Sequence, residues 1–198
     1  MPLDRAVCGA CLTRQAPDPV HRCVAVLDYG YPWAGLIARW KFGADAGWSG
    51  LWADVMLRDA QVLPLLIDNH LLVPVPVAPS RLAARGFNQA WELARALLRR
   101  TPHPRPLALA DALVRVRDTP DQHSLPRAQR LQNLRGVFAA HPQHGAALAG
   151  TQVLLVDDVS TTGATLEAAA QTLLDGGAAR VQALVLARTP LGEQALAR

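Results

Sequence analysis

The sequence has little of several features, and each scarcity excludes a class of protein. Lysine occurs once, at Lys41, although the chain has 20 Lys and Arg together, so arginine supplies nearly all the positive charge. Three cysteines are an odd number, which argues against a disulfide framework. No apolar run approaches the roughly 20 residues of a membrane helix, and the first residues lack a signal-peptide pattern. We therefore expect a soluble protein of the cytoplasm, without membrane insertion.

The charge balance permits contact with nucleic acid without demonstrating it. The 20 basic residues face 16 acidic ones, which gives a net charge of +4. Arginine binds phosphate through two parallel hydrogen bonds, but a GC-rich genome would also favour arginine over lysine. Aromatic residues make up only 5% of the chain, so base stacking on single strands has weak support. The length fits one domain with a small appendage.

The stretch from residue 153 to residue 165 carries the strongest chemical signal. Four apolar residues, Val153–Val156, predict a strand buried on both faces, and a helical pattern resumes at Thr165. Asp157 and Asp158 therefore come at the carboxyl end of a strand, where open α/β sheets bind ligands. An ordinary strand-to-helix connection with a capping residue is the plain alternative. The turn is neither a P-loop nor a Rossmann turn, because it lacks both glycine patterns.

The chemistry of this turn suits a ribose 5-phosphate with a bound metal. Gly163 permits a positive φ angle, and backbone amides ahead of a helix N-terminus attract phosphate. The hydroxyl groups of Thr161, Thr162 and Thr165 add donors. Asp157 and Asp158 accept hydrogen bonds when ionised, so they suit ribose hydroxyls or a hydrated Mg²⁺.

A second segment has features of a ligand site. Residues 70–77 predict an apolar strand whose prolines should end the ladder at about Val73 and begin a shaped loop. Arg81 and Arg85 follow, four residues apart and thus on one face of a helical turn. Two guanidinium groups beside a ligand loop fit a diphosphate. Asn88 can cap the helix that continues to Arg100.

The other elements follow from hydrophobic spacing. Ser49 is a plausible N-cap for a helix to about Leu66 that breaks near Pro64. Residues 118–135 predict either a mobile loop or a loop with a short helix from Arg127, and a plain solvated connection explains them equally well. A strand, helix and strand over 153–187 predict a right-handed parallel crossover. We expect the remaining strands at 24–31, 112–117, 136–140 and 181–187, helices at 34–42 and 166–174, and a surface turn at 141–150.

Cys8 and Cys11 form a CxxC pair, which is half of a tetrahedral zinc site. His21 and Cys23 are near enough in sequence to complete it, but their spacing is not that of a paired knuckle. The zinc prediction therefore rests on weak evidence. Lys41, near the end of the helix at 34–42, is a solvated helix end or a phosphate contact.

The 153–165 stretch resembles the phosphoribosyl pyrophosphate (PRPP) signature of the type I phosphoribosyltransferases. Several separate motifs, in the same order, resemble the ComF family within that superfamily, and the similarity covers nearly the whole chain. The matching motifs are Tyr31-Pro32, residues 39–43, residues 73–76, residues 85–89, Arg115-x-Arg117-x-Thr119, Gln129-x-Leu131-x-Asn133 and Phe138.

The resemblance implies an α/β fold with a type I phosphoribosyltransferase-like parallel sheet flanked by helices, over residues 24–198. Residues 1–23 would be an N-terminal appendage, in which Cys8 and Cys11 resemble the second pair of a zinc knuckle whose first pair is absent. The implied ligand is PRPP with Mg²⁺. Asp157 and Asp158 would contact ribose and metal, and Arg81 and Arg85 the pyrophosphate. The 5-phosphate loop would comprise Ser160, Thr161, Thr162, Gly163, Ala164 and Thr165, and a hood from 118–135 would add Arg127 or Arg130.

The family resemblance also implies a role in DNA uptake during natural competence, with single-stranded DNA and competence proteins as partners. The alternative is an active phosphoribosyltransferase with a small acceptor unrelated to DNA, in which Asp157, Asp158 and Arg85 are the catalytic candidates. Thr161 occupies a position where purine-using enzymes often have an aspartate base, and threonine cannot serve as a base at neutral pH. Purine salvage is thus disfavoured. A purine-type repressor lacks support, because no helix-turn-helix segment remains.

Overall fold

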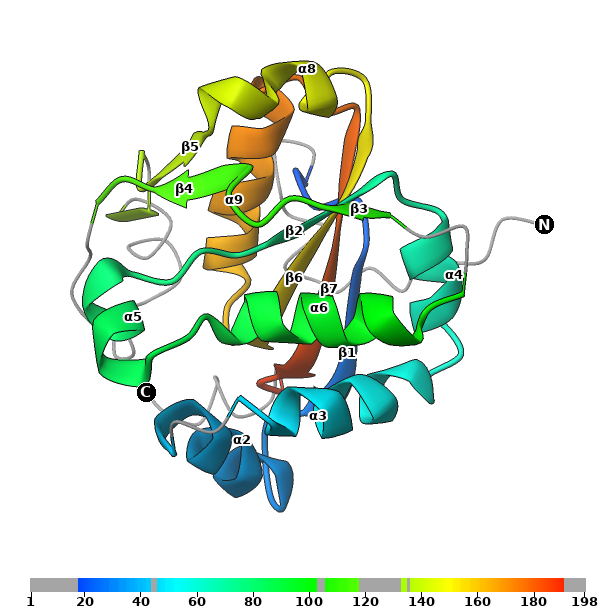
Figure 1. Ribbon diagram of the computed structural model, residues 1–198, viewed down its shortest axis with the longest axis vertical. Helices are drawn as coiled ribbons and strands as arrows, with labels where there is room; N and C mark the ends of the chain where they lie inside the picture. Colours follow the sequence, from blue (N-terminus) through cyan, green and yellow to red (C-terminus); the bar gives the residue numbers. More distant parts are fainter. Residues whose placement is uncertain (1–17, 44–45, 103–105, 118–132, 135, 191–198) are drawn as a thin grey trace.

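The protein is built around a five-stranded parallel sheet (Figure 1). The computed structural model describes residues 18–43, 46–102, 106–117, 133–134 and 136–190, and every structural statement below concerns these residues. Across the sheet, the strand order is β1 (Cys23–Asp28), β7 (Arg180–Arg188), β6 (Gln152–Ser160), β2 (Leu71–Pro74) and β3 (Leu107–Ala108). All four strand pairs are parallel, which confirms the predicted fold class.

The two crossover helices connect strand pairs on either side of the middle of the strand order. Helix α6 (Gln89–Arg100) connects β2 to β3 on one side, and α9 (Ala164–Asp175) connects β6 to β7 on the other. The parallel pairing of β6 with β7 confirms the predicted crossover. Because the chain leaves the adjacent strands β2 and β6 in opposite directions, their carboxyl ends form a topological switch point.

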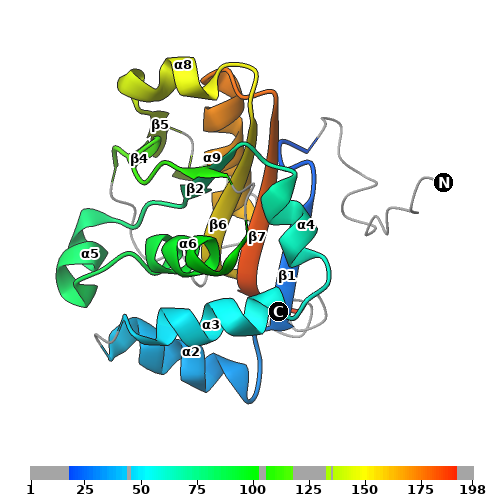
Figure 2. The same ribbon diagram turned by 45° about the vertical axis from the view of Figure 1, so that its right-hand side comes forward.

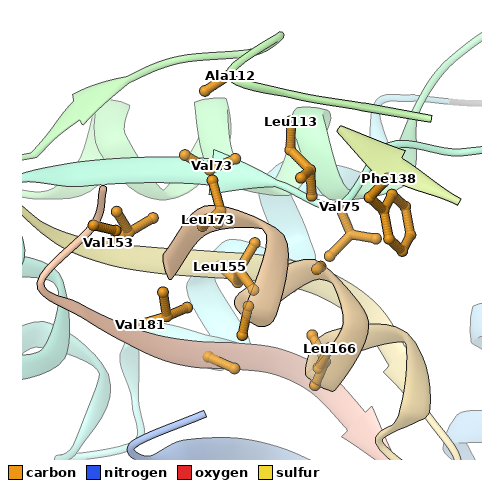
Figure 3. Close-up of a cluster of buried hydrophobic side chains, with 14 of the residues drawn as sticks. Val73, Val75, Ala112, Leu113, Phe138, Val153, Leu155, Leu166, Leu173 and Val181 are labelled. Carbon is orange, nitrogen blue, oxygen red and sulfur yellow. The ribbon is translucent and has the colours of Figure 1, made fainter. Parts of the chain in front are cut away.

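Helices cover both faces of the sheet, and each face has its own apolar core. On one face α9 packs together with an antiparallel ribbon of β4 (Leu113–Arg115) and β5 (Phe138–Ala140), as Figure 3 shows. Helices α2 (Trp33–Phe42), α3 (Trp48–Leu57), α4 (Val62–Ile67) and α6 cover the other face (Figure 2). Strand β6 contributes Val153 and Leu155 to the first core and Leu154 and Val156 to the second. The prediction of a strand buried on both faces is confirmed.

Tryptophan side chains fix α2 against α3. The ring of Trp52 is fully buried and lies 6.3–6.4 Å, centroid to centroid, from the rings of Trp33, Trp40 and Trp48. Trp40 also lies 6.4 Å from Phe87, next to the start of α6. Large aromatic rings bury much apolar area and hold specific relative orientations. The cluster therefore gives α2, and with it Lys41, a defined position against the sheet.

The prediction of one helix from Ser49 to Leu66 was wrong. The helix ends at Leu57 and a second one begins at Val62, and Gly47 rather than Ser49 precedes the first. A carboxylate oxygen of Asp59 accepts the Gln61 amide at 2.8 Å, which stabilises a turn in place of continued helix. Pro64 lies in the first turn of α4, where its missing amide has no helical partner to lose.

Smaller differences lie at the ends of elements. Strand pairing extends past the predicted end at Val73, because the Val75 amide donates to the Val156 carbonyl at 2.9 Å. A short 3₁₀ helix, η1 (Pro142–His144), and α8 (Gly145–Leu148) lie where we predicted only a surface turn. Strand β1 begins at Cys23, one residue before the predicted domain boundary. None of the described helices combines the length and apolar composition needed to cross a bilayer.

Asn88 caps α6, as predicted, and also ties it to the loop after β2. Its side-chain oxygen accepts the amides of Ala90 and Trp91, and its nitrogen donates to the Val75 carbonyl at 3.1 Å. We expect Asn88→Ala to lower the free energy of unfolding by about 2 kcal/mol, since it removes a cap and a second hydrogen bond. Urea unfolding measures this. Asn88→Asp should lose roughly half as much, and equal stability of Asn88→Ala and the unchanged protein would contradict the account.

Candidate functional site

A cavity of about 310 Å³ opens at the switch point between β2 and β6. Residues 75–78, directly after β2, form one wall, and residues 157–166, at the end of β6 and the start of α9, form another. Strand β2 stops opposite Val156, whereas β6 continues to Ser160 beside β7. The last residues of β6 therefore have no strand neighbour on the β2 side, and residues 157–160 line the cavity there.

The structure brings together every described residue that the sequence assigned to PRPP. Arg81 and Arg85 come from α5 (Pro79–Arg85), the helix that follows the loop after β2. The remaining cavity-lining residues predicted from the sequence are Asp157, Asp158, Ser160, Thr161, Thr162, Gly163, Ala164 and Thr165. Segments about 75 residues apart in the chain thus share one cavity.

The loop before α9 has the geometry of a phosphate cradle. Gly163 adopts φ +80°, which side chains rarely tolerate, and a Cβ atom there would meet nothing within 4 Å. Its carbonyl accepts the Glu167 amide at 2.9 Å, which is the first hydrogen bond of the helix. The amides of residues 164–166 precede that bond and have no intrahelical acceptor. An anion above this open loop would meet amide donors and the positive end of the helix dipole.

The two carboxylates at the end of β6 lie in different environments. Asp158 forms an ion pair with Lys41, in which Nζ lies 3.0 Å from Oδ1 and the side chains are 16% and 12% exposed. Burial and the negative charge of Asp158 raise the pKa of Asp157 to about 7. The Asp158 amide, which donates to Asp157 Oδ1 at 2.8 Å, and the Lys41 charge act in the opposite direction. The carboxyl of ligand-free Asp157 therefore keeps its proton to a higher pH than an ordinary aspartate does.

Arginine side chains from other elements also line the cavity. Gly86, in the left-handed region at φ +79°, ends α5 and places Arg85 at the end of the helix. Arg85 donates to Gln89 Oε1 at 3.2 Å, and its guanidinium carbon lies 5.2 Å from the centre of the Phe42 ring. Arg81 and Arg115 line the same cavity. Several cations therefore share the cavity with two carboxylates and the loop before α9.

Comparison with known proteins identifies the family. Residues 82–195, more than half of the chain, match the phosphoribosyl transferase domain. The DNA utilization protein YhgH of Escherichia coli O6:H1 is 36% identical over 186 residues, which cover 92% of this chain and 78% of the relative. Competence protein F of Haemophilus influenzae is 32% identical over 189 residues, with coverage of 91% and 78%. The chain belongs to the ComF family of phosphoribosyltransferase-like proteins. Competence protein ComFC of Bacillus subtilis is 33% identical over 156 residues, 77% of this chain and 58% of that protein.

The described ComF residues fit the chemistry of PRPP and Mg²⁺. Oxygen ligands suit Mg²⁺, and Asp157 and Asp158 supply them at the cavity wall. The open space above Gly163 leaves room for a phosphate beside the backbone amides. Lys41, Arg81 and Arg85 provide the positive charge that a diphosphate needs.

Sequence reasoning missed part of this site. The side chains of Tyr29 and Arg115 line the cavity, and neither was assigned to it. Lys41 was left open between a solvated helix end and a phosphate contact, and the structure places it in the cavity. Arg115 had a usable signal, because it begins an alternating basic motif among the residues that resemble the ComF family. Tyr29 had none, since it follows β1 on the far side of the sheet order.

Four predicted residues lie outside the described residues. Cys8 and Cys11 belong to residues 1–17, so the zinc prediction and the N-terminal appendage stay predictions. Arg127 and Arg130 belong to residues 118–132, so the hood also stays a prediction.

Proposed function

We propose that this protein binds PRPP with Mg²⁺ in the cavity between β2 and β6 and acts in DNA uptake. The observation that carries the proposal is the convergence of the acidic pair, the phosphate loop and the arginines of α5 on one cavity at the switch point. The DNA part rests on relatives named for DNA utilization and competence. Single-stranded DNA, competence proteins and a cytoplasmic location are parts of the same proposal.

The residues divide the ligand among them by charge. The loop of residues 160–165 would hold the 5-phosphate, because it offers amides and hydroxyls without a negative side chain. Asp157 and Asp158 would hold the ribose hydroxyls and Mg²⁺. Arg81 and Arg85 would contact the diphosphate, whose charge their guanidinium groups match. Bound Mg²⁺ would neutralise part of that charge.

Lys41 and Arg115 extend this assignment beyond the sequence prediction. Lys41 reaches Asp158 from α2, so a ligand that uses Asp158 meets the ammonium group as well. Arg115 enters from β4, and its guanidinium carbon lies 5.7 Å from the centre of the Phe138 ring. Both cations line the cavity and suit the phosphate-rich end of PRPP.

We favour this function over a transferase with a small acceptor unrelated to DNA. Thr161 has no group that can act as a base at neutral pH. The names of the relatives also point to DNA rather than to small-molecule metabolism.

Isothermal titration of the full chain with PRPP, with and without Mg²⁺, tests the binding. We expect Mg²⁺-dependent binding that the double variant Asp157→Asn/Asp158→Asn reduces by at least about 100-fold, since each carboxylate makes a charge-assisted contact. Asp68→Asn is the matched control, because this exposed aspartate ends α4 ahead of β2, at the opposite edge of the sheet. Equal affinity of the double variant and the control would contradict the assignment.

Transformation frequency then tests whether the bound ligand serves DNA uptake. The same double variant would replace the ComF protein of a transformable strain that lacks its own copy. We expect the frequency to fall with the loss of PRPP binding, while Asp68→Asn supports normal transformation. Normal transformation by a folded, expressed double variant that no longer binds PRPP would show that PRPP binding in the cavity is not needed for DNA uptake.

A further inference from the structure

A group of metal-binding side chains lies outside the cavity. Asp111, His141 and His144 each place one ligand atom within 4.8 Å of the others. Asp111 is exposed and both histidines are half-buried. No other group of three or more such residues occurs within residues 18–43, 46–102, 106–117, 133–134 and 136–190. The function proposed above uses none of the three.

Local structure already holds these side chains together. His144 Nε2 lies 2.8 Å from Asp111 Oδ1, and the rings of His141 and His144 are 5.4 Å apart between centroids. The His141 amide donates to the Ala112 carbonyl at 2.9 Å, and the His144 amide donates to the His141 carbonyl at 3.0 Å. Backbone and side-chain contacts thus hold the three ligand groups near one another.

We propose that Asp111, His141 and His144 bind a divalent transition-metal ion, Zn²⁺ before others. Two imidazoles and a carboxylate are ligands that Zn²⁺ takes at about 2.0–2.2 Å. Ligand atoms around such an ion lie roughly 3 Å apart, and the Asp111–His144 pair already has this spacing. A ring rotation of His141 brings in the third ligand, and water completes the coordination at this exposed position.

Metal binding would break the contact between His144 and Asp111. The hydrogen that now lies between His144 Nε2 and Asp111 Oδ1 would sit on Nδ1 in the other tautomer of the neutral imidazole, which leaves the Nε2 lone pair and the carboxylate oxygen for the ion. His141 accepts the Gln143 amide at Nδ1, at a long 3.3 Å, so little is lost when the ring turns toward the ion. The ion thus replaces one short contact by three bonds.

The position of the site indicates a structural role. Asp111 precedes β4 and His141 follows β5, so both lie at the end of the ribbon where Leu113 pairs with Ala140. Arg115, which lines the cavity, pairs with Phe138 at the other end. An ion at the first end joins the chain entering the ribbon to the chain leaving it. It would anchor the ribbon that presents Arg115 without touching the PRPP ligand.

Titration of the full chain with Zn²⁺ tests the site, with Cys8 and Cys11 replaced by serine so that the N-terminal thiolates cannot contribute. We expect about one ion per chain, and at least a roughly tenfold weaker affinity in His144→Ala and in His141→Gln. His70→Gln is the matched control, because this exposed histidine precedes β2 and is not in the group. At the same concentration, Zn²⁺ should raise the thermal midpoint of the control by more than that of His144→Ala.

The variants should fold without metal, because the Asp111–His144 contact is exposed and such pairs contribute little. Circular dichroism of the metal-free variants checks this. Unchanged Zn²⁺ affinity in both histidine variants would overturn the proposal, as would loss of all binding with the two cysteines. Bound Co²⁺ should show no thiolate charge-transfer band, and such a band in the cysteine-replaced protein would assign the ion elsewhere. PRPP titrations are independent of these outcomes.

Discussion

Asp157→Asn should stabilise the ligand-free protein while it weakens Mg²⁺-dependent PRPP binding. Burial and the neighbouring Asp158 charge raise the pKa of Asp157 to about 7, so ionisation of this group opposes folding at higher pH. The difference from an unfolded value of about 3.9 corresponds to at most roughly 4 kcal/mol above pH 7. Asparagine is similar in size and carries no charge. We expect a gain of about 2 kcal/mol at pH 8, or roughly 4–8 °C in the thermal midpoint.

The direction of this stability change follows from how the protonation of Asp157 depends on pH. The folded protein holds a proton on Asp157 that the unfolded chain has released between about pH 4 and pH 7. Stability from this group is therefore complete below the unfolded pKa and is lost as the pH rises toward the folded pKa. The advantage of Asp157→Asn should be largest at pH 8 and should shrink as the pH falls to 5.

Thermal unfolding at pH 5, 6, 7 and 8 measures the effect, and Asp158→Asn is a control one residue away. Asp158 is paired with Lys41 at 3.0 Å, so its replacement leaves a half-buried ammonium group without its partner. The two variants should therefore change stability in opposite directions at pH 8. A loss of stability in Asp157→Asn that does not depend on pH would contradict the assigned environment of this carboxyl.

Arg85→Ala should weaken the binding of PRPP and leave the binding of ribose 5-phosphate almost unchanged. Arg85 lines the cavity from the end of α5, and we assign it to the diphosphate. A charge-assisted contact of this type contributes about 1.5–3 kcal/mol, so affinity for PRPP should fall roughly 10- to 100-fold. Ribose 5-phosphate has no diphosphate, so the affinity for it should change by less than about twofold.

Parallel titrations with the two ligands measure this selectivity, and Thr165→Val is the contrasting variant. Thr165 belongs to the phosphate loop and lines the cavity. Loss of its hydroxyl should therefore weaken the binding of both ligands by a similar factor of about 5. Arg99→Ala controls for the loss of a cation, because this arginine is exposed near the end of α6. An equal loss for both ligands in Arg85→Ala would place this arginine at the 5-phosphate instead.

Much of the fold follows from local sequence patterns. The apolar run before Asp157, the loop at Gly163 and the apolar spacing of α9 each determine their own structure, so the β6–α9–β7 crossover could be predicted. The helix predicted from Ser49 failed for a physical reason. A side-chain hydrogen bond at Asp59 competes with the helix, and hydrophobic spacing does not record such a contact.

The candidate site could be predicted only where its residues are close in sequence. The acidic pair and the phosphate loop come from one motif, and Arg81 and Arg85 come from one helix. Lys41 reaches the same cavity from α2, and its position depends on the packing of Trp40 against Trp52. Such long-range packing has no local signature, which is why neither Lys41 nor Tyr29 could be placed from the sequence.

The ion pair between Lys41 and Asp158 means that a side chain of the protein would compete with a ligand cation for Asp158. The ammonium group lies 3.0 Å from one carboxylate oxygen of Asp158, so a Mg²⁺ ion bound there, as we propose, would compete with Lys41. Because the competitor is tethered, its effective concentration is high and does not change with dilution. Mg²⁺ alone would bring no anionic group for the displaced ammonium group, whereas Mg²⁺ with a diphosphate would bring phosphate oxygens that can pair with it. If PRPP and Mg²⁺ bind as proposed, the pair would thus favour the complete ligand over its separate ions.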